Sequence, residues 1–213
     1  MSSTPFDPSE TPQASQSAKS VLRETLKAAR QALEPARAQQ LNHQLCVHLL
    51  RLVGDSDWLK IAAFHAFRGE PDLSAGLDAL AGAGRQLFLP KVGERGEMTF
   101  HRWAPGCVMT PNRFGIPEPV TDEVVRPEQL DLVLMPLVAY SPNGSRLGMG
   151  AGFYDRAFAF RPALGLSTPR LVGVAYRFQQ VDGLPSDPWD VPMDGCLTES
   201  GYEAFGPRSR GAW

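Results

Sequence analysis

One short stretch, RLGMGAGFYDR at residues 146–156, brings together residue types that bind phosphate and metal ions. Three glycines at alternate positions leave backbone N–H groups open to close approach by a phosphate. Arg146 adds a fixed positive charge with two-pronged hydrogen bonding, and Asp155 is a hard oxygen ligand suited to Mg²⁺. The stretch therefore predicts a phosphate-binding loop with a metal ligand beside it.

Two aromatic residues in the stretch, Phe153 and Tyr154, offer ring faces on which a planar heterocycle can stack. The glycine spacing is GxGxG, which differs from the dinucleotide-binding GxGxxG, and no Gly-Lys-Ser/Thr follows as in a P-loop. The spacing alone also fits a glycine-rich turn into a helix, with Asp155 as an ordinary first-turn acid and the aromatics as core. On these residues alone both interpretations stay open.

The composition sets the class of protein. The chain has 213 residues, of which 43% are hydrophobic, and this is enough for one domain with a substantial core. Its net charge of −2 argues against a nucleic-acid partner, although a local cluster of cations can still bind a small anion. No apolar run approaches the roughly 18 residues of a membrane span, and the N-terminus has no secretory signal. We therefore expect a soluble, cytoplasmic protein without a membrane partner.

The three cysteines, Cys46, Cys107 and Cys196, are widely spaced and show neither a CxxC pair nor a metal-ligand spacing. We expect free thiols in a reducing compartment. Each is interpreted as a small buried hydrophobe rather than as a nucleophile, because no activating group lies near it in the sequence.

Hydrophobic periodicity predicts the elements that must position the glycine-rich stretch. Apolar residues recur at helical spacing from about residue 19 to 53, with Pro35 interrupting, and shorter helices are expected over 72–83 and from 153 to 160. Strands are expected at 58–67, 85–92, 98–103, 130–140, 170–176 and 195–199.

Strands that alternate with helices predict an α/β fold, a three-layer α/β/α sandwich with a mainly parallel, Rossmann-like sheet. The nearly continuous apolar run 130–140 is typical of a central strand covered on both faces. The glycine-rich stretch follows that strand, at the edge where open α/β sheets bind ligands. We expect a mobile tail over 1–18, a single domain over 19–199 and a C-terminal tail over 200–213.

The stretch RLGMGAGFYDR resembles the signature of the 5-formyltetrahydrofolate cyclo-ligase family, also called methenyltetrahydrofolate synthetases. Further pieces fall in the family's order: Lys19-x-x-x-Arg23, FRGEPDL with Glu70, FGIPEP at 114–119, MPLVAY before the glycines, and PWDVPMD at 188–194. The resemblance spans about residues 19–199, and the ordered set is far more specific than any one motif.

The resemblance implies an enzyme that converts 5-formyltetrahydrofolate to 5,10-methenyltetrahydrofolate with ATP and Mg²⁺, releasing ADP and phosphate. It implies that the formyl oxygen attacks the γ-phosphate, after which N10 closes the ring and phosphate leaves. The partners expected are small molecules, folate and ATP, and the protein is expected to be a monomer.

The resemblance also implies roles for particular residues. Those assigned to ATP are Lys19, Arg23, Arg146, Leu147, Gly148, Met149, Gly150, Ala151, Gly152, Phe153 and Tyr154. Those assigned to the folate substrate are Glu70, Gly150, Gly152 and Tyr154. Asp155 and Asp190 match the family's Mg²⁺ positions, and Arg146, Tyr154 and Asp155 are the residues expected to act in catalysis.

Several of these residues also fit an ordinary structural role without a ligand. Lys19 and Arg23 lie one helical turn apart, so they can share one anion, but the same spacing fits a solvated helix face. Glu70 precedes a proline and fits an ordinary loop carboxylate. Some family members carry basic residues where this chain has Met149 and Ala151, so the remaining cations and Mg²⁺ must balance the phosphate charge.

Two other functions fit the same residues. One is a folate- or nucleotide-binding homologue that has lost turnover, and the other is an ATP-dependent enzyme for another pterin-like substrate. The joint presence of Lys19, Arg23, Arg146, Asp155 and Asp190 argues against a decayed site. A substrate panel separates the enzymes from one another.

Overall fold

The computed structural model describes residues 12–206. Its α-helices are α1 (Pro12–Gln31), α2 (Pro35–Gly54), α3 (Ser74–Gly82), α4 (Phe153–Phe158) and α5 (Phe160–Leu164). Its strands are β1 (Lys60–Ala62), β2 (Gln86–Val92), β3 (Met98–Trp103), β4 (Met109–Pro111), β5 (Pro117–Pro119), β6 (Val124–Val125), β7 (Leu132–Pro136), β8 (Ala139–Tyr140), β9 (Arg146–Leu147), β10 (Arg170–Val174), β11 (Gly195–Thr198) and β12 (Gly201–Ala204).

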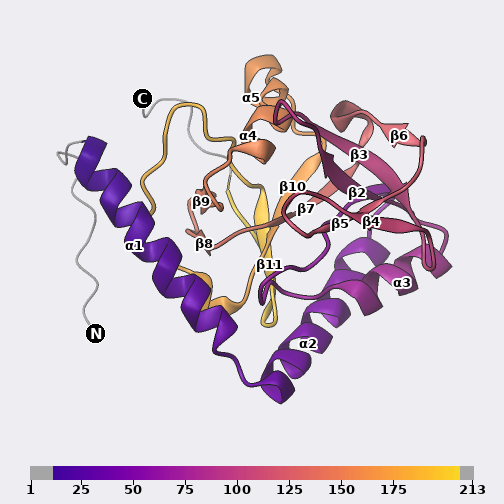
Figure 1. The fold of residues 1–213 in the computed structure, drawn as a ribbon, viewed down its shortest axis with the longest axis horizontal. Coiled ribbons are helices and arrows are strands. Elements are labelled where there is room, and N and C mark those ends of the chain that lie inside the picture. The colour runs from indigo at the N-terminus through magenta and orange to yellow at the C-terminus, as the bar shows by residue number, and fades with distance from the viewer. Residues whose placement is uncertain (1–11, 207–213) are drawn as a thin grey trace.

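Eight of these strands form one sheet in the order β12-β11-β10-β7-β1-β2-β3-β6 (Figure 1). The strands from β11 to β2 run parallel, while β12 at one edge and β3 and β6 at the other run antiparallel. Two short hairpins, β4-β5 and β8-β9, stand apart from the sheet. The predicted α/β fold with a mainly parallel sheet is confirmed.

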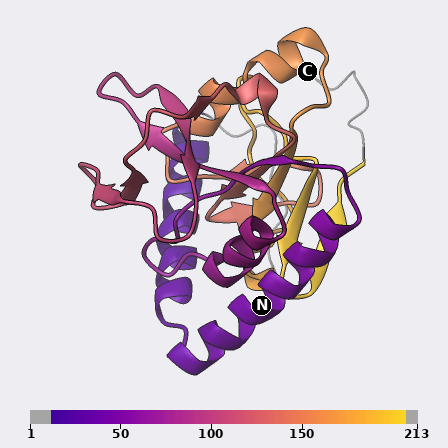
Figure 2. The same ribbon diagram turned by 90° about the vertical axis from the view of Figure 1, so that its right-hand side faces the viewer.

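Strand β7 is the central strand that its apolar run predicts. Leu132 and Leu134 belong to a core cluster shared with α2 and α3, whereas Val133 and Met135 belong to a second cluster shared with α4. Successive side chains of a strand point to opposite faces, so β7 is buried on both sides. Figures 1 and 2 show the helices on the two sides of the sheet, which gives the three layers expected.

Two strands are shorter than predicted, because the chain leaves the sheet to reach a cleft. Of the strand predicted over 58–67, only β1 forms. Beyond β1, Ala63 N donates to Phe88 O at 2.9 Å, and the chain then turns away from the sheet. The 130–140 run divides into β7 and β8, and β8 pairs with β9 in a hairpin that leads into the glycine-rich loop.

The expected boundaries at both ends need correction. Helix α1 begins at Pro12, so residues 12–18 continue a helix that was predicted to start at residue 19. Leu22 and Leu26 pack this helix against a cluster that contains Leu147, and helices propagate readily from an anchored turn. Strand β12 pairs with β11, so residues 201–204 belong to the sheet and not to a tail. Residues 1–11 and 207–213 lie outside the described residues.

The cysteines of the described chain are all free thiols, as predicted; Cys46 and Cys196 are buried and Cys107 is half-buried. No helix between residues 12 and 206 has both the length and the apolar character needed to cross a bilayer.

Candidate functional site

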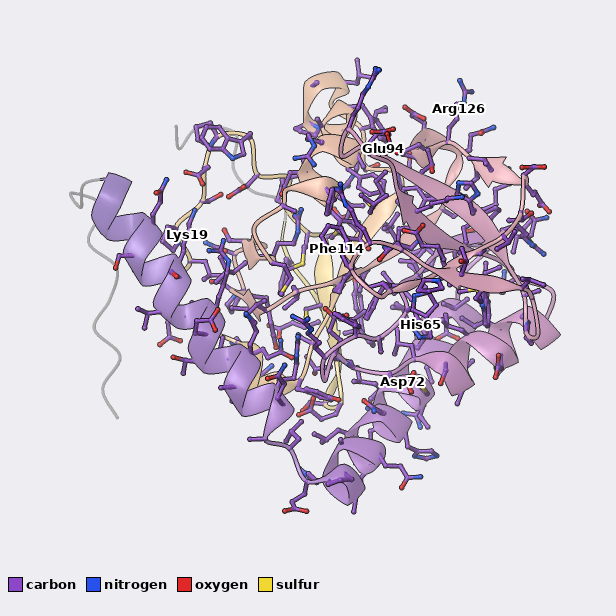
Figure 3. The ribbon with its side chains drawn as sticks, in the orientation of Figure 1. Lys19, His65, Asp72, Glu94, Phe114 and Arg126 are labelled. Atoms are coloured by element: carbon purple, nitrogen blue, oxygen red, sulfur yellow. The ribbon has the colours of Figure 1, made fainter. Side chains whose placement is uncertain are left out.

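A cleft of about 1030 Å³ lies at the carboxyl edge of the sheet. Phe64 and Leu137, which follow β1 and β7, line it together with Val92, the last residue of β2. Helix α1, the β4-β5 loop and the glycine-rich loop complete the walls; Figure 3 labels Lys19 on α1 and Phe114 in the β4-β5 loop, which both line the cleft. This is the edge at which open α/β sheets bind ligands.

The glycine-rich loop requires glycine at two positions. Gly150 has φ +103°, and Gly152, the N-cap of α4, has φ +65°; both values lie in a region that other residues rarely adopt. Two arginines hold the loop from either side. Arg23 Nε donates to Gly148 O at 2.9 Å, and Arg156 donates to Ala151 O at 2.8 Å.

Arg146 and Asp155 form a tight pair on the wall of the cleft. Arg146 Nη2 lies 2.6 Å from Asp155 Oδ1, and Arg146 Nη1 donates to the carbonyl of Val191. The backbone N–H of Val191 donates back to Asp155 Oδ1 at 3.1 Å. The three groups close a ring of contacts, which fixes the carboxylate and the guanidinium relative to each other.

Asp190 lies in the same wall, and Asp187 N donates to its Oδ2 at 2.8 Å. Burial raises the pKa of Asp190, and the nearby charge of Asp155 adds to the increase. Within residues 12–206 no group of three or more histidine, cysteine or acidic side chains forms a metal cage. Two carboxylates with repelling charges fit a Mg²⁺ that takes its other ligands from phosphates and water, which is how Mg²⁺ is commonly bound.

Helix α1 supplies two cations to the cleft. Lys19 Nζ lies 2.8 Å from Asp187 Oδ2, and Arg23 bonds the glycine loop as described. The side chain of Lys19 is 13% exposed, so the solvated helix face that was its alternative interpretation does not describe it. Both residues line the cleft together with Arg146.

Glu70 enters the cleft from the loop that follows β1. Its Oε2 accepts a hydrogen bond from Phe67 N at 3.1 Å, and its Oε1 lies 4.0 Å from Arg30 Nη2. Burial raises the pKa of Glu70, and the charge of Arg30 opposes the increase. The side chain is 12% exposed, so Glu70 is not the ordinary loop carboxylate in water.

The two aromatics of the loop both line the cleft but differ in their packing. Tyr154 stacks on Phe158 with ring centroids 6.4 Å apart, and burial raises its pKa, to which the charge of Glu70 adds. The guanidinium carbon of Arg156 lies 5.3 Å from the centroid of the Phe153 ring. Tyr154 and Glu70 therefore belong to one part of the cleft.

Every predicted site residue lines this cleft, whereas the second acid of the PWDVPMD motif does not. That acid, Asp194, instead pairs with Arg161 at 3.0 Å and accepts from Leu171 N at 2.7 Å, so its role is structural. The predicted set that lines the cleft is Lys19, Arg23, Glu70, Arg146, Leu147, Gly148, Met149, Gly150, Ala151, Gly152, Phe153, Tyr154, Asp155 and Asp190.

Arg30 and Asp187 are among the residues of the cleft that were not predicted. A signal existed for Arg30, because it lies seven residues after Arg23 and so falls on the same helix face. No local pattern marks Asp187, because its partner Lys19 lies 168 residues away in the sequence.

Comparison with known proteins gives the same assignment as the motifs. The profile of the 5-formyltetrahydrofolate cyclo-ligase family matches residues 15–199. The chain is 32% identical to the 5-formyltetrahydrofolate cyclo-ligase of Haemophilus influenzae, over 83% of this chain and 95% of that protein. It is also 32% identical to the enzyme of that name from Escherichia coli K12, over 80% of this chain and 94% of that protein.

Solved structures agree with these relatives. The NMR structure of Aquifex aeolicus 5,10-methenyltetrahydrofolate synthetase superposes with a TM-score of 0.75 at 34% identity, over 91% of this chain and 96% of that one. The Mycoplasma pneumoniae 5,10-methenyltetrahydrofolate synthetase superposes with a TM-score of 0.66 at 25% identity, over 85% and 98%. The chain belongs to the 5-formyltetrahydrofolate cyclo-ligase family.

Proposed function

We propose that this enzyme joins N10 of 5-formyltetrahydrofolate to its formyl carbon, with ATP and Mg²⁺, and releases 5,10-methenyltetrahydrofolate, ADP and phosphate. The observation that carries the proposal is that one cleft contains both a glycine-rich loop with nearby cations and a buried acid near the Tyr154 ring. Two substrates that must react with each other need such a shared cavity.

The chemistry explains why ATP is needed. A formyl amide oxygen is a poor leaving group, so it first attacks the γ-phosphorus, and the bond from that phosphorus to the β-γ bridging oxygen breaks to release ADP. N10 then attacks the activated formyl carbon and loses its proton, and the carbon–oxygen bond breaks to release phosphate. The contribution of the protein is positioning and balancing of charge, as in phosphoryl transfer generally.

The phosphates are assigned to Arg146, Lys19, Arg23 and the glycine-loop amides. Arg146 is already oriented by Asp155 and the Val191 carbonyl, so it needs little reorganisation when a phosphate arrives. Lys19 and Arg23 are held by an acid and a backbone carbonyl that an incoming phosphate replaces.

Asp155 and Asp190 are the residues assigned to Mg²⁺. Arg146 and Val191 both bond Oδ1 of Asp155, and within residues 12–206 no donor bonds its Oδ2. A Mg²⁺ held by these two carboxylates would supply positive charge to balance the phosphates.

The folate is assigned to Glu70 and Tyr154. A carboxylate can accept hydrogen bonds from adjacent pterin N–H groups, and burial makes those bonds strong. Tyr154 offers an apolar ring next to that acid.

The test is to mix the purified protein with 5-formyltetrahydrofolate, ATP and Mg²⁺ and to follow the near-ultraviolet absorbance of the methenyl product. We expect a rise that needs ATP and that falls by about 100-fold or more in Asp155→Asn. The matched control is Asp122→Asn, an exposed acid that does not line the cleft, which should behave as wild type.

The other outcomes identify the alternatives. No rise with folate still bound indicates a binding protein without turnover. No rise and no binding indicates another substrate. Size-exclusion chromatography of the same preparation tests the proposed monomer.

A further inference from the structure

The geometry points to Arg30 as a positioning residue that holds Glu70 in place to receive the folate. The inference rests on the proposed function and extends it to a residue of α1 that the motifs of the family resemblance do not include. Arg30 also connects the folate-binding acid to the helix whose other cations face the phosphate-binding loop.

Arg30 is an unusual residue to find inside the fold, because its side chain is only 2% exposed. Its Nη1 donates to Leu137 O at 3.2 Å, and its Nη2 donates to Arg68 O at 3.4 Å. Nη2 also lies 4.0 Å from Glu70 Oε1. One guanidinium therefore contacts the chain after β7 and both the backbone and the acid of the loop after β1.

The loop that presents Glu70 is shaped around this arginine. Arg68 has φ +48° and Gly69 has φ +77°, so two successive residues adopt left-handed backbone. A Cβ at Gly69 would lie 3.3 Å from the backbone oxygen of Arg30, which shows how closely the loop approaches α1. Glu70 closes the turn twice, because its N donates to Phe67 O and its Oε2 accepts from Phe67 N, both at 3.1 Å.

Packing alone does not hold the Glu70 carboxylate. A second cavity of about 270 Å³ lies next to it and shares Arg30, Arg68 and Glu70 with the large cleft. A carboxylate with space on two sides can rotate unless polar contacts prevent it. Within residues 12–206 those contacts are the Phe67 N–H and the Arg30 guanidinium, of which Arg30 alone brings a charge.

Stability does not account for Arg30. A buried ion pair generally adds little to stability over an apolar residue of similar size. Here the pair is long, and Arg30 Nε has no hydrogen-bond partner within residues 12–206. The buried and incompletely paired guanidinium of Arg30 is better explained by its effect on Glu70, whose carboxylate it holds in one position.

Arg30 shares its helix face with the proposed phosphate-binding cations. Lys19, Arg23 and Arg30 are separated by four and seven residues, which are whole turns of a helix, and all three line the cleft. Helix α1 thus contacts both the phosphate-binding loop and the folate-binding acid.

The test is a double-mutant cycle on the full-length protein with Arg30→Gln, Glu70→Gln and both together, measuring KM for each substrate. Arg30→Gln is expected to raise KM for 5-formyltetrahydrofolate about tenfold, and to change KM for ATP by less than about twofold. In the Glu70→Gln background the same change should add almost nothing, because the group through which Arg30 acts is gone. Arg30→Lys, which keeps the charge but loses the fork, should recover part of the loss.

Arg161→Gln is the matched control, since Arg161 is also buried and paired with an acid, and its Nε has no partner in the described part of the chain, but it does not line the cleft. It should lower the melting temperature while leaving both KM values unchanged. Suppose that the wild type is active. The inference is then wrong, and the proposed function still stands, if Arg30→Gln leaves the folate KM unchanged, raises the two KM values equally, or has an effect that adds to that of Glu70→Gln. A wild type without turnover overturns the proposed function and the inference with it.

Discussion

At the residue scale, the pair of Arg146 and Asp155 combines two tasks. The guanidinium that is proposed to bind phosphate also orients the carboxylate that is proposed to bind Mg²⁺. A charge that is already fixed by its neighbours stabilises a transition state without reorganising. Loss of either partner should therefore weaken the binding of both ATP and Mg²⁺.

Arg146→Ala is expected to raise KM for ATP at least tenfold, with a smaller effect on KM for folate, because the phosphate loses its preformed partner. It should also lower the free energy of unfolding by about 2–4 kcal/mol, since it leaves a partly buried carboxylate unpaired. Steady-state kinetics and urea unfolding check the two effects. Arg177→Ala removes an exposed pair with Glu203 and should cost less than about 1 kcal/mol. A greater effect on folate KM would move Arg146 to the folate site.

Glu70 should make folate binding depend on pH. Because burial raises its pKa, Glu70 takes up a proton at a higher pH than an ordinary glutamate and then loses acceptor capacity. Folate affinity should fall as pH decreases through this folded-state pKa, and titration calorimetry should show a flatter profile for Glu70→Gln. Identical pH profiles for the two proteins would remove Glu70 from the site.

The same raised pKa has a consequence for stability with a definite sign. Between the pKa of Glu70 in the unfolded chain and its higher value in the folded chain, the folded protein binds more protons. The contribution of Glu70 to stability is therefore greatest at low pH and declines as pH rises through the folded pKa. Urea midpoints of wild type and Glu70→Gln should accordingly diverge as pH rises through this window.

At the element scale, the glycine-rich loop needs glycine for its left-handed backbone at Gly150, whereas at Gly148 the backbone does not need glycine. Gly150→Ala places a side chain at φ +103°, and it should lower the free energy of unfolding by about 1–2 kcal/mol and raise KM for ATP. Gly148→Ala is the matched control, since its Cβ would meet no atom within 4 Å and no left-handed φ is needed there. Thermal melts and ATP kinetics of both variants compare the positions; equal stabilities would contradict a conformational requirement at Gly150.

The elements themselves were largely predictable from local pattern. The continuous apolar run at 130–140 gave a central strand, and the alternation of strands and helices gave the class of fold. The limits of the strands were less predictable, because the apolar residues 63–67 continue beyond β1 as cleft wall and core, and not as sheet. Strand β12 was missed since its sequence, GYEA, is half exposed and lacks alternation.

Contacts between residues far apart in the sequence could not be predicted from local sequence patterns. Lys19 and Asp187 are 168 residues apart, and Arg30 contacts Leu137 across 107 residues. Sequence periodicity assigns a face of a helix but not the partner that the face meets. The family motifs supplied the proposed site residues; the packing of α1 brought Arg30 and Asp187 into the same cleft.

At the scale of the whole molecule, the cleft is assembled from segments distributed along the chain. Polar contacts join these segments, including Lys19 of α1 with Asp187 and Arg23 of α1 with Gly148 O of the glycine-rich loop, and the loop carrying Glu70 lines the same cleft. The centre of the sheet is apolar and buried by comparison. If these segments bind phosphate as proposed, they are the part of the molecule that ATP stabilises most.

Hydrogen exchange with and without ATP and Mg²⁺ tests this coupling. When ATP is present at about 100 times its Kd, any opening that must release it is disfavoured by about 2.7 kcal/mol, or about 100-fold. Amides of α1 around Arg23, of the glycine loop and of residues 187–191 should slow together, because one ligand holds all three, whereas β6 at the far edge of the sheet should not change. Slowing of the glycine loop without α1 would mean that the helix cations do not bind phosphate, and the loop and Arg146 would then bind ATP alone.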